Sequence, residues 1–509
     1  MDTSSRGASD TEIFDVAIGD RVGRIAAMRP NTPAIIAVAP NGTETRCTWT
    51  ELDHRSTQCA SVLARHGVSA GDLVVVALPS TADHAVAALG AWKRGATVLP
   101  LDPRLPPAEF KRLIAATHPS VCVGVSGEDI ECPRVNVDEW RDAETTISSQ
   151  SDGARLVPRS AAATSGSTGR PRVILNRRAW VFDERELPSA HERSIGLEIG
   201  QVQLVVLPLS HGGFGALHRG LVLAHTIVLI PTFIPRLVAT SIENYGINVM
   251  RLVPTMMKLL LLPDVGLGDS DLSSIAALHH GTAPCPAGVK EAWMDLLGPE
   301  KVYESYASQE QLGFVYIRGD EWLRHPGSVG RPGADMLVIV GEDDARVPAN
   351  QIGRIFIRPP DGSHPEYLGA GQRLAEWGEG YFSVGDLGYL DEDGYLFVTS
   401  RSDDCINVGG ANVYPAELEA VLAASDDVVD SLVIARPHPV LGQVPHAVVV
   451  ARDPDSPDLA DRLTSHCRRN LPSHKVPASF EFVQSIPRNE NGKVTLAARA
   501  AANWAGPGA

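Results

Sequence analysis

The chain has 509 residues, of which 44% are hydrophobic and 21% charged, as in a globular protein long enough for about three domains. A formal net charge of −16 excludes a broad basic surface for nucleic acid or an anionic membrane, so a phosphate ligand would need local cationic groups. The seven cysteines are scattered without a CxxC pair, which favours reduced thiols in a cytoplasmic protein over disulfides or a zinc site. The polar start shows no secretory signal, and no apolar run is long enough to predict a membrane span.

The first part of the chain alternates between strand and helix patterns. The expected elements are a strand at Ala34–Ala39, a helix at Glu51–His66 with Thr50 as its N-cap, a strand at Leu73–Leu78 and a helix at Ala82–Arg94. Such alternation predicts parallel α/β layers.

A loop rich in small hydroxyl residues and glycine follows at Thr164-Ser165-Gly166-Ser167-Thr168-Gly169. Glycine lets backbone N–H groups turn inward, and Ser and Thr add short donors, so the loop suits a polyphosphate with Arg170 or Arg172 at its edge. The same composition also fits a flexible linker. No Gly-Lys-Ser/Thr closes the loop, so it is not a Walker motif.

Together with Pro171 and Arg172, this loop resembles the phosphate loop of the adenylate-forming superfamily, which contains acyl- and aryl-CoA ligases, peptide-synthetase adenylation domains and luciferases. That family usually has Lys in place of Arg172 and Gly in place of Val173. The resemblance extends over nearly the whole chain. It implies an α/β fold with a large N-terminal domain of doubly wound sheets plus a small β-barrel-like subdomain (1–402), and a smaller, mobile α+β C-terminal domain (403–509).

Two glycine-containing turns follow predicted strands in the middle of the chain. The strand Gln201–Leu209 ends just before His211, where doubly wound sheets open their binding crevice, although the residues alone favour a packing or turn histidine. The resemblance implies that His211 lies beside the acyl pocket. It also implies that Gly281-Thr282-Ala283 contacts adenine and the carboxyl end of the substrate. The adjacent His279 and His280 would face opposite ways on a strand, so we do not expect a metal site there.

The segment Tyr306-Ala307-Ser308-Gln309-Glu310 combines an aromatic ring, a hydroxyl and a carboxylate, which suit a metal–nucleotide site. It resembles the Tyr-Gly-x-Thr-Glu motif of the family, with Ala307 and Ser308 in place of Gly and Thr. The resemblance implies that Tyr306 stacks on adenine, Ser308 binds the α-phosphate and Glu310 binds Mg²⁺. A solvated acid at a helix start is the alternative for Glu310.

Beyond residue 330 the pattern changes to short alternating strands, such as Asp335–Gly341 and Gly353–Arg358, which predict a small β-barrel or sandwich. Asp386 follows a glycine and matches the acid with which the family binds the ribose diol. An isolated Gly-Asp pair is usually only a turn.

The segment from Thr399 to Glu419 fits a further family motif closely. The resemblance implies that Arg401 bonds the ribose, that Asp403 is the hinge between the domains, and that Gly409-Gly410 lines the pantetheine channel. Ser400 replaces the usual Gly, and Asn407 stands where Lys is common.

The end of the chain reads as a small α/β domain with helices at Pro415–Ala424 and Asp458–Asn470 and strands at Val428–Arg436 and His446–Arg452. Lys493 follows Asn-Gly at a loop tip, where a lysine is normally solvated. The catalytic lysine of the family stands in the same arrangement.

These motifs predict ATP-dependent activation of a carboxylic acid, with Mg²⁺ as cofactor and CoA as acceptor, by a monomer or homodimer. Gly212-Gly213 and Ala283 indicate a roomy pocket and an aromatic or other apolar acid. One alternative is a carrier-protein thiol, an amine or another unusual nucleophile as acceptor in natural-product biosynthesis. The other is a non-catalytic nucleotide-binding relative, which only Arg172 and Val173 favour.

Overall fold

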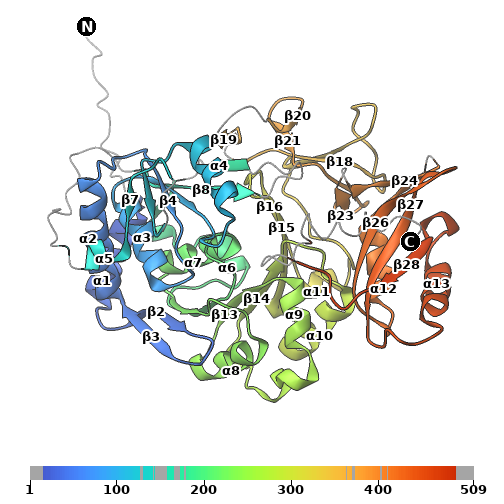
Figure 1. Cartoon of the computed structure of the whole chain (residues 1–509), viewed down its shortest axis with the longest axis horizontal. Helices are drawn as coiled ribbons and strands as arrows, with labels where there is room; N and C mark the ends of the chain where they lie inside the picture. Colours follow the sequence, from blue (N-terminus) through green and yellow to red (C-terminus); the bar gives the residue numbers. More distant parts are fainter. Residues whose placement is uncertain are drawn as a thin grey trace, which may run out of the picture.

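Five sheets and their helices form the part of the chain that the computed structural model describes, namely residues 15–125, 130–141, 143, 157–164, 172–176, 179–360, 362, 364–368, 373–401, 404–409, 411–488 and 494. The N-terminal elements lie at one end of the molecule and the C-terminal sheet at the other (Figure 1).

The described helices are α1 (Ile18–Met28), α2 (Trp49–Arg65), α3 (Ala82–Lys93), α4 (Pro107–Thr117), α5 (Val137–Arg141), α6 (Ala190–Ser194), α7 (Gly212–Val222), α8 (Pro235–Tyr245), α9 (Pro254–Leu260), α10 (Ala287–Leu297), α11 (Gly319–Trp322), α12 (Pro415–Ala423) and α13 (Leu459–Asn470). The described strands are β1 (Asp15–Ala17), β2 (Pro33–Val38), β3 (Glu44–Thr48), β4 (Leu73–Val76), β5 (Thr97–Pro100), β6 (Val121–Val123), β7 (Arg134–Val135), β8 (Arg159–Thr164), β9 (Arg172–Asn176), β10 (Val181–Asp183), β11 (Val202–Val205), β12 (Thr226–Leu229), β13 (Val249–Leu252), β14 (Ala277–Gly281), β15 (Val302–Ala307), β16 (Phe314–Arg318), β17 (Leu337–Val340), β18 (Gly353–Ile357), β19 (Glu366–Leu368), β20 (Ala375–Trp377), β21 (Tyr381–Ser383), β22 (Asp386–Leu390), β23 (Leu396–Arg401), β24 (Ile406–Val408), β25 (Ala411–Val413), β26 (Val428–His438), β27 (Gly442–Ala451) and β28 (Ser479–Phe482).

The two largest sheets are mostly parallel. The eight-stranded sheet has the order β16-β15-β14-β13-β11-β12-β2-β3, and all its strands except the two edge strands run parallel. The seven-stranded sheet has the order β19-β9-β8-β5-β4-β6-β7, in which β9 and β19 are antiparallel additions to a parallel set. These sheets confirm the expected α/β fold class.

Side chains on the two faces of each sheet enter different cores. Val74 and Val76 of β4 share a core with Ile35 of β2 and with α1, α2, α3 and α7, which therefore lie between the two large sheets. Val75, on the opposite face, packs with Phe110 of α4. The outer face of the eight-stranded sheet is covered by α8, α9 and α10. Alternation along each strand thus builds a helix–sheet–helix–sheet–helix stack.

Helix α2 begins two residues earlier than the sequence predicted. Thr48, not Thr50, is the N-cap: its side chain accepts a hydrogen bond from the backbone N–H of Glu51, whose carboxylate accepts one from the N–H of Thr48 at 2.7 Å. The prediction of Thr50 was wrong because it ignored this reciprocal pattern, in which Glu stands three residues after Thr.

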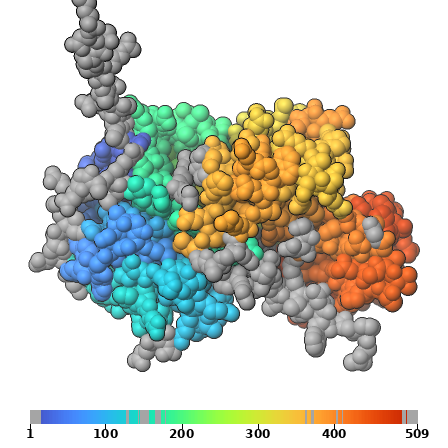
Figure 2. Space-filling model, turned by 90° about the horizontal axis from the view of Figure 1, so that it is seen from above, coloured from blue at the N-terminus to red at the C-terminus, as the bar shows by residue number. Residues whose placement is uncertain are grey.

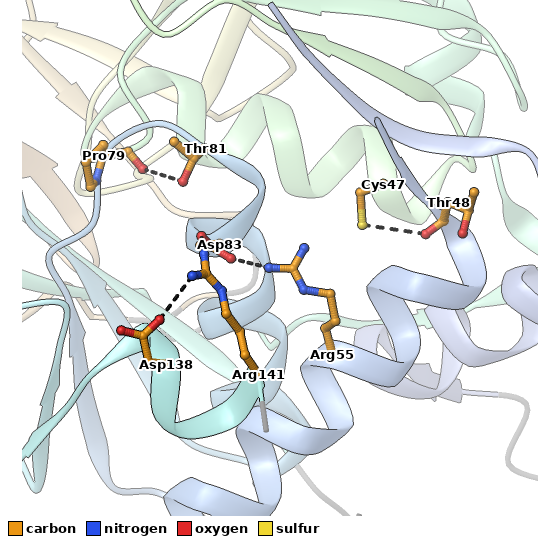
Figure 3. Close-up of polar contacts among 8 residues, drawn as sticks. All are labelled: Cys47, Thr48, Arg55, Pro79, Thr81, Asp83, Asp138 and Arg141. Carbon is orange, nitrogen blue, oxygen red and sulfur yellow. Dashed lines mark hydrogen bonds and ion pairs between the residues drawn. The ribbon is translucent and has the colours of Figure 1, made fainter. Parts of the chain in front are cut away.

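An ion-pair cluster joins α2, α3 and α5 (Figure 3). The carboxylate of Asp83 on α3 accepts from Arg55 of α2 and, at 3.1 Å, from Arg141 of α5. Arg141 also donates to Asp138 at 3.0 Å within α5. These contacts fix the relative positions of three helices in the first half of the large domain.

The third sheet is entirely antiparallel, as expected for the small barrel-like subdomain, with the order β20-β21-β18-β22-β23 and β17 paired to β18. One strand from the same stretch of chain leaves this sheet. β19 pairs with β9 instead, through contacts such as Tyr367 opposite Ile174, and so extends the seven-stranded sheet.

A smaller C-terminal domain follows, with a sheet of order β25-β24-β27-β26 to which β28 adds in parallel beside β27. Helices α12 and α13 pack on this sheet through a separate core. The domain forms a lobe at one end of the molecule (Figure 2). It contacts the large domain where Lys258 of α9 donates to the carbonyl oxygen of Val429 in β26.

Over the described ranges, no helix has both the length and the apolar character that crossing a membrane requires.

Candidate active site

The predicted site residues of the large domain follow neighbouring parallel strands. Gly281 ends β14, Tyr306 lies near the end of β15, and His211 stands between β11 and α7. His211 also interacts electrostatically with Asp102, which follows β5 of the other large sheet. The carboxyl ends of strands from both large sheets therefore meet here, which is where open α/β sheets form binding crevices.

Two glycines at this edge allow close contacts with the backbone of a neighbouring segment. A Cβ at Gly281 would lie 2.5 Å from the carbonyl oxygen of Ser305, and one at Gly213 would lie 2.0 Å from the carbonyl oxygen of Leu207. The sequence-based interpretation of Gly213 as part of a roomy pocket was therefore wrong, because its missing side chain makes room for backbone. Thr282 has φ +70°, a left-handed conformation that is rare for a β-branched residue, so the Gly281-Thr282-Ala283 turn is strained.

Three residues predicted to bind the adenosine lie together although they come from three strands. The hydroxyl of Tyr306 (β15) donates to Asp386 Oδ2 (β22) at 2.7 Å, and Arg401 Nε (β23) lies 3.6 Å from Asp386 Oδ1. Arg401 also donates to the carbonyl oxygen of Val384 at 2.6 Å. Burial, followed by the charge of Asp386, raises the pKa of Tyr306 well above its usual value, so the phenol keeps its proton and acts as a donor.

A second group surrounds the predicted metal ligand. Tyr367 of β19 donates its hydroxyl to Glu310 Oε1 at 3.1 Å. Burial, followed by the charge of Glu310, raises the pKa of Tyr367, whereas Arg172 acts in the opposite direction. Glu310, Tyr367 and Arg172 are thus neighbours, brought together because β19 pairs with β9. Sequence reasoning missed Tyr367, since no local pattern indicates that pairing.

Two polar atoms beside this group are buried without a hydrogen-bond partner among the described residues, namely Ser308 Oγ and Arg172 Nε. Unsatisfied buried donors are rare in native proteins and call for an explanation such as a ligand. Both belong to residues predicted to contact phosphate, and a polyphosphate offers the acceptors that these donors lack. The residues present therefore fit ATP with Mg²⁺ on the Glu310 carboxylate.

Some predicted residues lie outside the described part of the chain. Thr164 is the last residue of β8 and lies opposite Arg172 of β9, so the predicted phosphate loop joins two adjacent antiparallel strands. Outside the described residues lie Ser165, Gly166, Ser167, Thr168, Gly169, Asp403, Gly410 and Lys493.

Gly409 lies at the hairpin between β24 and β25. Its φ of +59° is left-handed, and its N–H donates to the carbonyl oxygen of Leu441 at 2.9 Å. The hairpin alone would therefore favour glycine at this position, whether or not Gly409 lines a pantetheine channel.

Two further charged groups at the same sheet escaped the sequence analysis. Arg251 of β13 donates to Ser305 Oγ at 3.3 Å, next to Tyr306. On the opposite face, Lys290 of α10 forms an ion pair with Glu304 of β15 at 2.7 Å. A charged residue within a strand gives no local signal of the face it occupies, and only the register between strands reveals it.

His325, Asp391 and Asp393 form another group that could hold a metal. The carboxylate of Asp391 already accepts hydrogen bonds from the backbone N–H groups of Asp393 and Tyr395, at 3.0 and 2.8 Å. These bonds shape the turn between β22 and β23, so a metal is not needed to explain the group.

Comparison with known families shows which family the chain belongs to. The sequence model of the AMP-binding enzyme family matches residues 23–368, and that of the AMP-binding enzyme C-terminal domain matches residues 417–493. The chain belongs to this family. It is therefore an AMP-forming acid–thiol ligase by family, as the resemblance of its motifs implied.

Named relatives cover nearly the full length of this AMP-binding enzyme. The 2-succinylbenzoate–CoA ligase of Bacillus licheniformis is 26% identical over 88% of this chain and 93% of its own. The fatty acid–[acyl-carrier-protein] ligase ScoC of Streptomyces coeruleorubidus is 27% identical over 92% and 93%. The structure of o-succinylbenzoate CoA synthetase from Bacillus subtilis with an acyl-adenylate intermediate has a TM-score of 0.79 at 25% identity, over 97% of this chain and 99% of the other. The same enzyme is also known with ATP and magnesium.

Proposed function

We propose that this AMP-binding enzyme activates a carboxylic acid with ATP and passes the acyl group to the thiol of CoA. In the first step a carboxylate oxygen attacks the α-phosphorus, and the bond to pyrophosphate breaks. In the second step the thiol sulfur attacks the acyl carbon, AMP leaves, and the thiol proton goes to solvent. Positioning and charge neutralisation supply most of the catalysis in such chemistry.

The contact between Tyr306 and Asp386 is the observation that carries this proposal. With Arg401, it gathers an aromatic ring, a carboxylate and a guanidinium at the edge of the sheet. A ring suits stacking on adenine, and a carboxylate suits a ribose diol because it can accept two hydrogen bonds. In the proposal these residues hold the adenosine, while Thr282 and Ala283 face adenine and the reacting carboxylate.

The phosphates would be held by the loop from Thr164 to Gly169, with Arg172 and Ser308 as further donors. Glu310 would hold Mg²⁺, and the hydroxyl of Tyr367 would orient its carboxylate. Bound Mg²⁺ would supply neutralisation of the pyrophosphate charge. His211 would line the pocket for the body of the acid, which we expect to be aromatic or otherwise apolar.

The two steps require different poses of the small domain in this proposal. Lys493 would bridge the carboxylate and the α-phosphate during adenylation. A pivot near Asp403 would then bring Gly409-Gly410 to the site as the wall of the pantetheine channel.

Separate assays of the two half-reactions test this proposal. Lys493→Ala should lose adenylate formation but still transfer the acyl group from pre-made acyl-adenylate to CoA. Gly409→Leu should do the reverse, because a bulky side chain fills the channel and leaves the nucleotide site intact. Since Gly409 has a left-handed φ, Gly409→Asn is the matched control, as asparagine tolerates that conformation.

Two results would contradict the channel assignment. One is a folded Gly409→Leu variant, checked by circular dichroism, in which both half-reactions keep their rates. The other is equal loss of both half-reactions in the Leu and Asn variants, which would mean that Gly409 serves only its turn.

A carrier-protein thiol is the second candidate acceptor, favoured by the relative named as an acyl-carrier-protein ligase. An amine or another nucleophile stands as a further alternative, and thioester formation with CoA alone separates all of these from the main proposal. A non-catalytic nucleotide-binding role would give no acid-dependent release of pyrophosphate with any acid.

A further inference from the structure

Arg251 places a positive charge on the inner face of the eight-stranded sheet. It lies in register with His279 of β14, which in turn lies opposite Tyr303 of β15. Residues in register on neighbouring parallel strands share a face, so these three side chains point to the same side. Val249 and Ala277 on this face pack against Ile195 in a small apolar cluster, and the guanidinium of Arg251 lies at the edge of this cluster.

The polar atoms beside Arg251 offer it little compensation. Its guanidinium donates to Ser305 Oγ at 3.3 Å, and that hydroxyl in turn donates to the carbonyl oxygen of His280. His279 stacks on Tyr303 with ring centroids 5.2 Å apart, and its Nε2 is buried without a hydrogen-bond partner among the described residues.

No carboxylate forms an ion pair with Arg251 among the residues that the structure describes. Burial lowers the pKa of Arg251, and the neighbours that act electrostatically on His279 are Arg251, His280 and His191, all basic. Burying a charge without a partner is costly, and natural proteins retain such groups chiefly where a ligand completes them. Burial also lowers the pKa of His279 to about 3 and that of His280 well below its usual value, so both imidazoles are neutral and Arg251 carries the charge of this site.

The site adjoins the predicted reaction centre. Ser305 is followed by Tyr306, and Gly281, in register with Ser305, begins the turn expected to face the reacting carboxylate. His279 stands two residues before Gly281 on the same face, so roughly 7 Å of strand separates the two positions. Aromatic rings lie nearby, since His191 contacts the rings of Phe314 and Tyr316 at 5.5 and 5.2 Å between centroids.

We propose that the guanidinium of Arg251 binds a second carboxylate at the far end of the acid that this enzyme activates. This inference rests on the proposed function and adds the substrate class, a dicarboxylic acid. The separation of roughly 7 Å favours carboxyl groups joined by a short chain or one ring. The body between them would meet the aromatic rings, in agreement with the aromatic or apolar acid that the sequence predicts.

Matched pairs of acids test this class. We would measure acid-dependent pyrophosphate release with pentanedioate against pentanoate, hexanedioate against hexanoate, and benzene-1,3-dicarboxylate against benzoate. For at least one pair, kcat/KM should be about tenfold or more higher for the diacid, the ratio that one charge-assisted hydrogen bond supports. In Arg251→Met this ratio should fall to 1 or less.

Arg318→Met is the matched control, because Arg318 lies on β16, the edge strand of the same sheet, and is already ion-paired to Asp320 at 2.6 Å. It should keep the wild-type ratio. Arg251→Met should also melt no lower than wild type, since it removes a buried charge without a protein partner. A large fall in melting temperature would make Arg251 a structural residue and overturn the inference.

The inference and the proposed function fail in different ways. Activation of monocarboxylic acids at least as efficiently as diacids in every pair would overturn the inference and leave the function standing. An equal rise in the KM for ATP with both classes of acid in Arg251→Met would assign Arg251 to the nucleotide and also overturn it. If no acid releases pyrophosphate, the function fails, and calorimetric titration with the same pairs decides the inference: tighter diacid binding lost in Arg251→Met supports it, and equal binding refutes it.

Discussion

Strands β13 to β15 carry a buried charge on each face, and the two differ in whether an opposite charge lies beside them. On the outer face, Glu304 is paired with Lys290 at 2.7 Å, and the ammonium also lies 4.4 Å from the centre of the Trp322 ring. On the inner face, one residue further along β15, Ser305 accepts a hydrogen bond from Arg251, and the described part of the chain gives Arg251 no carboxylate partner. A charge with an internal partner contributes to the fold, whereas a charge without one is available to a ligand.

Both members of the Lys290–Glu304 ion pair are buried. Burial raises the pKa of Glu304 and lowers that of Lys290, and their mutual attraction opposes both shifts. Removing one partner would leave the other uncompensated in the core. The comparison therefore predicts that substitutions on the outer face change stability, and that substitutions of groups facing the crevice change activity.

The largest effect should come from breaking the outer pair. Lys290→Met should lower the free energy of unfolding by about 3–5 kcal/mol, because Glu304 would be left buried and unpaired. Adding Glu304→Met should recover most of the loss. Urea unfolding followed by tryptophan fluorescence measures both. Arg462→Met, which breaks an ion pair with Asp427 on the C-terminal domain, is the control and should cost no more than about 1 kcal/mol.

On the crevice side, Glu310→Ala should reduce acid-dependent pyrophosphate release by about 100-fold or more, with no loss of melting temperature. The control is Glu321→Ala, since Glu321 also accepts from a tyrosine hydroxyl, that of Tyr395 at 2.7 Å, but lies on α11. Normal release by Glu310→Ala at ordinary Mg²⁺ would remove Glu310 from the site.

A smaller effect is expected for the hydroxyl of Tyr306. Tyr306→Phe keeps the ring and removes the bond to Asp386, so the KM for ATP should rise about tenfold, as for the loss of one hydrogen bond to a charged group. Initial-rate kinetics at saturating acid measures this change. Tyr395→Phe removes a similar bond away from the crevice and should leave the KM unchanged.

The smallest change should follow a substitution that keeps the charge at the phosphates. Arg172→Lys should retain activity, because the lysine ammonium still places a positive charge at the phosphates, although without the planar guanidinium of arginine. Arg172→Ala removes the charge and should raise the KM for ATP. An unchanged KM in the alanine variant would make Arg172 a solvated neighbour and leave its buried Nε unexplained.

The sequence predicted which helices and strands form better than it predicted the residues at which they begin and end. Local periodicity located α13 to within a residue, because this helix buries one face. An alanine-rich composition located α3 equally well, although α3 is buried continuously from His84 to Trp92. The sequence prediction placed the N-cap of α2 wrongly, at Thr50, because the reciprocal Thr48–Glu51 pair was not recognised. The predicted strand Gln201–Leu209 was too long, since only Val202–Val205 joins the ladder.

The candidate site could be predicted where a residue stands in a motif, and not where it depends on register. Asp386 and Tyr306 are 80 residues apart, yet each has its own motif, and the structure brings them together. Tyr367 comes beside Glu310 only through the pairing of β19 with β9, and Arg251 comes beside Ser305 only through the pairing of β13 with β14 and of β14 with β15. Such pairings depend on long-range packing, which the local sequence does not encode.

The pairing of β19 with β9 also determines how the chain can be divided. A strand made of residues 366–368 closes the edge of a sheet whose other strands end at residue 176, so the first half of the chain is not a separable module. A fragment that stops before residue 366 would expose the N–H and C=O groups of β9, and an open strand edge promotes aggregation. Expression boundaries and split-protein designs should therefore fall after the β22–β23 hairpin, so that β19 stays with the strands it covers.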